Sequence, residues 1–436
     1  MKNILKLAIA GFITIIPVVI IEMYLFLFPM NYMDGEYPYW KANKDFIEGK
    51  VSDDTTENFQ NIILGDSVPN GGIRTELLNG SVYNLAVGGM TPIEAYYEMK
   101  YYLMDHSALR TAFIAFGPNH IMRQDCWVGR TQYFNYLKYD DVKTIIDTAR
   151  RLNDSLYITS AEDARAYRIK RPDKFLPALF NSDFSGRRES NLNNYELTLN
   201  HKGSYVGVGS DTIQDTSDST LASLDEFSAS PTNDFYYHKL IDLLLENGVD
   251  VFIIQNPVKE SSFDKIKPDV LDAYWKYYRQ LASEYKNIHV EQEFLLFPDT
   301  CYRDGAHVNY YGAAKWTNSL KETYADKLND GVESENKIKE RVEFLKESSS
   351  LPALLTASND AGLDVKLWMS DESEIRSDDD YNHLLDELPY SEFTKPTPDQ
   401  NGDIPFLQAD IYDHSTGEML LEKNYSYSED KVIQAY

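Results

Sequence analysis

Cysteine is scarce in this sequence: the 436 residues include only two, Cys126 and Cys301. This scarcity excludes a small scaffold held together by disulfides and a zinc site built from several cysteines. The two thiols could form one disulfide if this part of the chain lies in an oxidising compartment, or both could stay reduced. The sequence leaves these two alternatives open.

Basic residues are also few. The chain has 42 lysines and arginines against 69 aspartates and glutamates, which gives a formal net charge of −27. Nucleic-acid binding is therefore not expected, because phosphates must be neutralised by lysine and arginine. A broad surface for a polyanion is not expected either, so any anionic acceptor would have to meet a local basic patch.

The sequence lacks long hydrophobic runs except for one near the N-terminus. Residues Leu7 to Met30 are almost wholly apolar, a length that spans a bilayer as one helix. The interruptions are Thr14, Pro17 and Glu22. We expect an uncleaved single-pass anchor rather than a cleaved signal peptide, because the run is longer than a usual signal-peptide core and no small-x-small site follows it.

The charges that flank this run predict its orientation in the cell membrane. Lys2 and Lys6 precede it, whereas Asp34 and Glu36 follow it. The positive-inside rule then makes the N-terminus cytoplasmic and the rest of the chain extracytoplasmic. Glu22 is costly at membrane depth and indicates a partner helix; the alternative is that it lies near the outer headgroups.

The remaining chain alternates strand and helix patterns, which favours an α/β fold with a parallel sheet. Its hydrophobic content of 43% suits a proper core, and its length predicts more than one domain. The expected strands are Asn61–Leu64, Val82–Ala86, Thr111–Phe116, Val249–Gln255 and Ile288–Val290. The expected helices are Pro92–Met104, Asp141–Leu152, Asn233–Glu246, Lys267–Tyr285 and Tyr310–Leu328.

One short stretch of this pattern can carry chemistry. Ile62 to Leu64 is an apolar run typical of a strand buried on both faces, and Gly65 allows a sharp turn before Asp66 and Ser67. That turn lies at the carboxyl edge of the expected sheet, where open α/β folds hold their sites. A Gly-Asp-Ser tripeptide also occurs by chance, so the stretch alone could be an ordinary turn.

A partner for this serine lies far downstream. Serine is a weak nucleophile unless a base takes its proton, and a histidine base needs a third group to orient it. Asp304 and His307, three residues apart, can supply both on one loop. The order Ser67, Asp304, His307 is therefore a stronger signal than either piece by itself.

These pieces resemble the SGNH (GDSL) family of hydrolases and acyltransferases, whose members carry four sequence blocks. Gly65-Asp66-Ser67 is similar to the first block, and Asp304-Gly305-Ala306-His307 is similar to the last. The resemblance implies a three-layer fold with a parallel sheet flanked by helices. It also implies a nucleophilic Ser67, a base at His307, an orienting Asp304, and neither a metal nor a cofactor.

The second and third blocks are implied to supply the oxyanion hole. Asn84–Thr91 resembles the second block, in which Gly89, or failing that Gly88, would give a backbone N–H. Gly117-Pro118-Asn119 resembles the third, whose Asn119 side chain would be a further donor. The family usually has Asp where His120 follows here.

The last block also resembles a membrane-anchored branch of the family, because Asn309 and Gly312 follow His307. Proteins of this kind O-acetylate exopolysaccharides or D-alanylate teichoic acids beside a multi-span membrane-bound O-acyltransferase. The resemblance therefore implies transfer of an acetyl or D-alanyl group to a cell-envelope or secreted glycan. The alternatives are a membrane-anchored esterase that removes acetyl groups and a catalytically silent envelope-binding subunit.

These interpretations predict five parts of the chain. They are an anchor (1–33), a linker (34–58), a catalytic domain (59–330) with an insertion near 121–231, a helical linker (331–350) and an acidic accessory module (351–436). In the insertion, Arg187-Arg188 and His201-Lys202-Gly203 bring positive charge that could contact an anionic or sugar acceptor; the alternative is a solvated loop.

The last part carries roughly half of the net negative charge. We expect it to be β-rich, with strands at Leu363–Met369, Phe406–Tyr412 and Met419–Leu421. The run Asp378–Asp380 lacks the spacing of a calcium loop and indicates a solvated turn.

Overall fold

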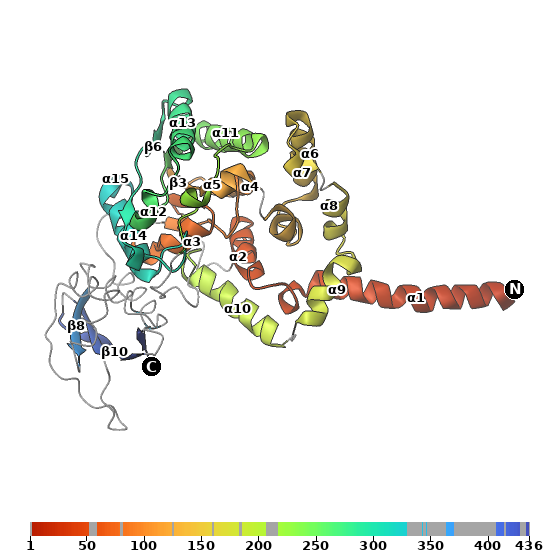
Figure 1. The fold of residues 1–436 in the computed structure, drawn as a ribbon. Helices are drawn as coiled ribbons and strands as arrows, with labels where there is room; N and C mark the ends of the chain where they lie inside the picture. Colours follow the sequence, from red (N-terminus) through yellow and green to blue (C-terminus); the bar gives the residue numbers. More distant parts are fainter. Residues whose placement is uncertain are drawn as a thin grey trace, which may run out of the picture.

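The computed structural model describes residues 2–51, 59–78, 82–123, 126–158, 161–182, 185–205, 217–328, 342, 346, 363–369, 407–413, 416–427 and 433–435. Its centre is a parallel sheet flanked by helices (Figure 1). This sheet has five strands in the order β2-β1-β3-β4-β6. These strands are β1 (Asn61–Gly65), β2 (Val82–Asn84), β3 (Thr111–Ala115), β4 (Asp250–Ile253) and β6 (Ile288–Val290). The five expected strands and the α/β class are confirmed.

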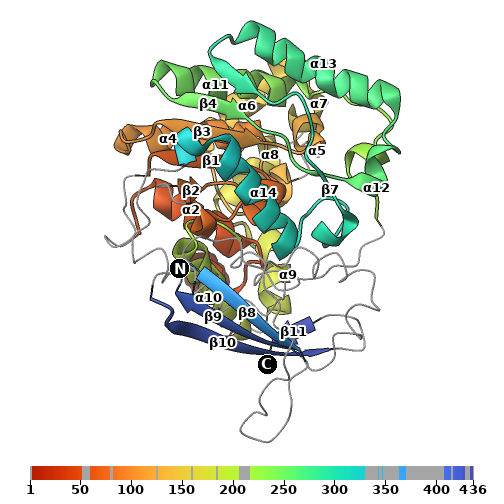
Figure 2. The same ribbon diagram turned by 90° about the vertical axis from the view of Figure 1, so that its left-hand side faces the viewer.

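Helices cover both faces of this sheet. Successive side chains of a strand point to opposite faces, so Ile62 and Leu64 of β1 join one buried cluster and Ile63 joins the other. The first cluster is covered by α4 (Pro92–Asp105), α11 (Pro231–Glu246) and α13 (Pro268–Glu284). The second is covered by α14 (Tyr310–Thr323), which lies across the strands in Figure 2 and is followed by α15 (Ala325–Leu328). The expected helices are confirmed, the last of them as two pieces.

The segment expected as a linker contains a buried helix. After η1 (Pro29–Asn31), α2 (Tyr37–Ile47) buries Trp40 and Phe46 in the main core. Phe46 stacks on Tyr83 of β2 with ring centroids 3.7 Å apart. The α2 part of the expected linker 34–58 is therefore a packed helix of the fold, because its large aromatic side chains contact apolar residues of the core.

The long insertion is mostly helical in its described residues. A π-helical segment, η4 (Trp127–Gln132), is followed by α6 (Tyr139–Leu152), α7 (Ser155–Ile158), α8 (Ala161–Arg168), α9 (Pro172–Asn181) and α10 (Ser185–Asn200). α10 packs against α2, so the insertion contacts the N-terminal part of the fold. His201, at the end of α10, is buried and does not lie on a solvated loop.

The insertion buries a lysine, and this gives a pH prediction. Burial, with help from Lys44, lowers the pKa of Lys170 to about 7 from an ordinary 10.5. Above pH 7 the folded chain has released this proton, whereas the unfolded chain keeps it until about pH 10.5, so the unfolded state binds more protons. Stability should therefore rise with pH across this window, by up to about 1.4 kcal/mol per pH unit. Urea unfolding of wild type and Lys170→Met, compared at several pH values, measures this slope; equal slopes would contradict the assignment.

The end of the chain forms a separate antiparallel sheet of order β11-β10-β9-β8. Its strands are β8 (Leu363–Met369), β9 (Leu407–Asp413), β10 (Met419–Tyr427) and β11 (Ile433–Ala435). The three expected strands are confirmed. Most of the expected helical linker (331–350) and the Asp378–Asp380 run lie outside the described residues.

The N-terminal helix α1 (Lys2–Leu27) contains Pro17 and projects from one side of the molecule (Figure 1). Among the residues that the structure describes, no helix reaches the length and apolarity needed to cross a membrane. The anchor, its orientation and the partner helix for Glu22 stay predictions.

Candidate active site

Ser67 lies at the carboxyl edge of the central sheet, directly after β1. Asp66 caps the short helix α3 (Ser67–Gly72), and its Oδ1 accepts a hydrogen bond from the Val68 N–H at 2.8 Å. Gly65 must be glycine because a Cβ there would overlap the Ala115 carbonyl of β3. The tight strand-to-helix turn therefore fixes the position of the serine hydroxyl.

The Asp304–His307 loop is held by its own aspartate. Asp304 Oδ1 accepts hydrogen bonds from the backbone N–H groups of Ala306 (2.8 Å) and His307 (2.7 Å). The loop follows η6 (Asp299–Cys301) and precedes α14, whose first turn is capped by Asn309. These bonds set the direction in which the histidine ring points.

The two loops meet although 240 residues separate them. Ser67 Oγ lies 2.7 Å from His307 Nε2, and His307 Nδ1 lies 2.8 Å from Asp304 Oδ2. With Nδ1–H donating to the carboxylate, Nε2 is left to accept the serine proton. The structure thus brings Ser67, His307 and Asp304 into one hydrogen-bonded series.

The charge of Asp304 is strongly favoured in this arrangement. Partial burial raises its pKa, but the hydrogen bond and charge of His307 and the two backbone N–H groups outweigh burial, so that the pKa lies well below its usual range. A carboxylate that stays ionised can orient the imidazole and stabilise its charged form.

A buried aspartate connects two of the sequence blocks. The other oxygen of Asp66, Oδ2, accepts a hydrogen bond from the Gly117 N–H at 2.5 Å and lies 3.8 Å from His120 Nε2. Asp66 is completely buried. It therefore ties the serine turn to the loop that follows β3, a structural role that the sequence motif did not reveal.

The expected oxyanion residues are placed differently from one another. Gly88 and Gly89 lie on the wall of the cavity that contains Ser67. Gly89 has φ +81°, and a Cβ there would overlap the Cys126 thiol. Asn119, in α5 (Pro118–Met122), is not among the residues on this wall, and its buried Oδ1 has no hydrogen-bond partner in the described part of the chain. The amide of Asn70 does reach the wall, but it donates to the carbonyls of Ala86 and Gly203.

The cavity has a volume of about 330 Å³, which is the size of a small-molecule site. Its lining comes from segments that are far apart in the sequence: Glu36, Tyr39, Trp40, Ser67, Asn70, Gly88, Gly89, His120, Cys126, Arg130, Tyr205, Arg303 and His307. Several of these were missed from the sequence. The only signals for them were the aromatic run around Trp40 and the position of Arg303 beside Asp304.

An ion pair stands on the cavity wall. Arg130 of η4 makes two contacts with Glu36, and it also contacts the thiol of Cys126. Burial raises the pKa of Glu36, and Arg130 opposes that rise. Cys126 and Cys301 are both buried, and no disulfide joins them in this structure.

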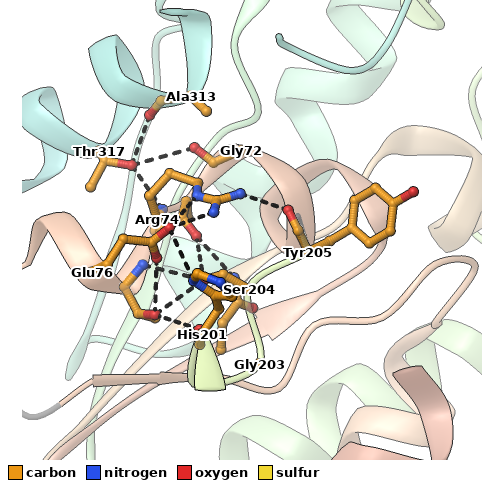
Figure 3. Close-up of polar contacts among 12 residues, drawn as sticks. Gly72, Arg74, Glu76, His201, Gly203, Ser204, Tyr205, Ala313 and Thr317 are labelled. Carbon is orange, nitrogen blue, oxygen red and sulfur yellow. Dashed lines mark hydrogen bonds and ion pairs between the residues drawn. The ribbon is translucent and has the colours of Figure 1, made fainter. Parts of the chain in front are cut away.

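A buried polar network anchors another part of the wall (Figure 3). Arg74 donates to the Tyr205 carbonyl at 2.6 Å and binds Glu76, while the Tyr205 N–H donates to the Asn70 carbonyl at 2.9 Å. Ser204 is bonded to Thr75 and Ile73 from the same segment. The end of the insertion is thereby fixed against the chain that follows α3.

No protein-family model matches this chain, and no curated protein sequence matches it. In the described residues there is also no cluster of histidine, cysteine and carboxylate side chains that could hold a metal ion. The geometry of the site is therefore the observation that bears on its chemistry.

Proposed function

We propose that this protein is a serine acyltransferase of the SGNH type, which carries an acyl group on Ser67 and passes it to a hydroxyl of a glycan. The observation that supports this most directly is the series Ser67 Oγ, His307 Nε2, His307 Nδ1 and Asp304 Oδ2, with links of 2.7 and 2.8 Å. Nucleophile, base and orienting group at hydrogen-bond distance are what covalent acyl transfer needs.

In the first half-reaction, Ser67 Oγ attacks the carbonyl carbon of an ester or thioester while His307 Nε2 takes the hydroxyl proton. The backbone N–H groups of Ser67 and Gly89 are the proposed donors to the oxyanion. Collapse of the tetrahedral intermediate breaks the bond to the leaving group, which takes the proton from His307. An acyl ester of Ser67 remains.

In the second half-reaction, the acceptor hydroxyl gives its proton to His307 and attacks the acyl carbon. The bond from the acyl carbon to Ser67 Oγ then breaks, and His307 returns the proton to Ser67 Oγ. An acceptor from a glycan yields the transferase, whereas water yields the esterase, the alternative function. The cavity wall carries Tyr39 and Tyr205, whose rings make a T-shaped contact with centroids 5.0 Å apart, and aromatic side chains in a cavity can pack against a sugar. A catalytically silent subunit would not require the 2.7 Å contact between Ser67 and His307.

The place of the reaction is proposed from the sequence. A single N-terminal anchor would hold the catalytic part outside the cytoplasmic membrane, and a multi-span membrane-bound O-acyltransferase would deliver the acetyl or D-alanyl group. The acceptor would be a teichoic acid or another cell-envelope or secreted glycan.

The test is to trap the acyl group on Ser67. The full-length chain is mixed with 4-nitrophenyl acetate and acid-quenched, and the Ser67 peptide is examined by mass spectrometry for an added acetyl group. Ser67→Ala should lose the adduct, and Ser283→Ala, an exposed serine on α13, should keep it. Glycan oligosaccharides are then added to distinguish the two functions. Acetylated sugar is the product expected of the transferase, whereas free acetate alone would indicate the esterase. An unlabelled Ser67 with acetyl, D-alanyl and thioester donors would contradict the proposal.

A further inference from the structure

Arg303 is a cation on the cavity wall whose nearest carboxylate already has other partners. It lies beside Ser67 and His307, with 22% of its side chain exposed. Its Nε is 3.9 Å from Asp304 Oδ2, too long for a hydrogen bond, and this buried nitrogen has no hydrogen-bond partner among the described residues. Asp304 itself is committed to His307 and to two backbone N–H groups.

The other arginine of the cavity is a useful contrast. Arg130 makes two contacts with Glu36, so its charge is balanced by a carboxylate on the same wall. Arg303 has no such bidentate partner in the part of the chain described here. A guanidinium presents a planar fork of donors that matches a carboxylate or a phosphate, and a half-buried fork with open donors is suited to bind one.

The position of Arg303 is set before any substrate arrives. Its guanidinium lies over the ring of Tyr205, 5.7 Å from the centroid, and that ring also makes a T-shaped contact with Tyr39. The backbone of Tyr205 is held by Arg74 and Asn70, as Figure 3 shows for Arg74. A pre-positioned donor loses little conformational entropy when it binds an anion.

The overall charge of the chain makes this local cation informative. With a net charge of −27, the surface as a whole repels anions, so an anionic substrate needs a specific positive group at the site. We propose that Arg303 binds an anionic group, a carboxylate or a phosphate, of the substrate that exchanges its acyl group with Ser67. This deepens the proposed function and rests on it for the acyl chemistry, but the binding of the anion can be tested without turnover.

The first experiment measures binding in a chain that cannot react. Full-length Ser67→Ala is titrated calorimetrically with benzoate, phenyl phosphate and the neutral benzamide. We expect benzoate or phenyl phosphate to bind at least about tenfold more tightly than benzamide. The anion that binds more tightly shows whether Arg303 prefers a carboxylate or a phosphate. Introducing Arg303→Gln into the Ser67→Ala chain should remove this preference for the anion, whereas introducing Arg303→Lys should preserve part of it.

The matched control is Arg150→Gln, which removes an exposed arginine of α6 that pairs with Asp147 and is not among the residues that line the cavity. It should leave the preference for the anion unchanged. Equal binding of all three probes, or a preference that survives Arg303→Gln, would overturn the proposal.

A second measurement distinguishes binding of the substrate anion by Arg303 from an indirect effect of Arg303 on the position of Asp304. The ratio of kcat/KM for 4-acetoxybenzoate to that for 4-acetoxybenzamide should fall about tenfold or more in Arg303→Gln. An equal fall for both esters would mean that Arg303 acts through Asp304, and would overturn the proposal. If Ser67 of the wild type takes up no acyl group from these esters or from the D-alanyl and thioester donors, the proposed function fails, while the binding experiment still decides the role of Arg303.

Discussion

Ser67→Ala should reduce ester turnover by at least about a thousandfold, because no other hydroxyl is hydrogen-bonded to His307 in the described residues. The loss should appear in kcat, since the removed group acts on the reacting carbon rather than on substrate binding. Stopped-time assays with a chromogenic acetyl ester measure it. The thermal unfolding temperature should stay close to that of wild type, because α3 is capped by Asp66 and not by the serine.

His307→Ala serves as the partner experiment. When nucleophile and base act as one unit, removing both costs little more than removing either. We therefore expect Ser67→Ala, His307→Ala and the double variant to show similar residual rates. Near-normal turnover in either single variant, or additive losses in the double variant, would contradict the mechanism.

Arg74→Ala should destabilise the fold by about 3–5 kcal/mol, the usual cost of removing one partner of a buried ion pair. Arg74 and Glu76 are 1% and 4% exposed, and Arg74 Nε donates to Glu76 Oε1 at 2.9 Å. Burial raises the pKa of Glu76, but Arg74 and His201 outweigh burial and hold it below its ordinary value. Without Arg74 a buried carboxylate would have to take up a proton or lie uncompensated. Urea unfolding at neutral pH measures the change.

The matched variant replaces both partners. Arg74→Met combined with Glu76→Leu removes the pair without leaving a buried charge, and should recover most of the lost stability. Both Arg74→Ala and this double variant lack the donor to the Tyr205 carbonyl, so kcat/KM should be lower than in wild type in both, even where stability has returned. Arg150→Ala on the exposed face of α6 should change stability by no more than about 0.5 kcal/mol. A loss below about 1 kcal/mol in Arg74→Ala would contradict the importance of the pair.

Much of the central fold could be predicted because its signals are local. The strands β1 and β3 are buried on both faces and so read as continuous apolar runs, and Pro92 marks the start of α4. Ser67, Asp304 and His307 could be singled out because each stands in a short motif whose residue types suit one reaction. The structure then brings the three side chains together.

The rest of the site depends on contacts between distant segments. Tyr39 and Tyr205 come from parts expected to be a linker and an insertion, and nothing in either sequence shows that they meet. The partner of Arg130 is Glu36, 94 residues away. Asn119 stands where the motif predicts it in the sequence, but the cavity wall contains its neighbour His120 and not Asn119.

The wall contributed by α2 has a consequence for the reach of the reaction. Only nine residues lead from Leu27, the last of α1, to Glu36 on the cavity wall, and even a fully extended chain of that length spans only about 30 Å. If α1 is the membrane anchor that the sequence predicts, the cavity would lie close to the membrane surface, and acceptors would have to reach it there. A shortened chain that begins after α2 would lack part of the cavity wall.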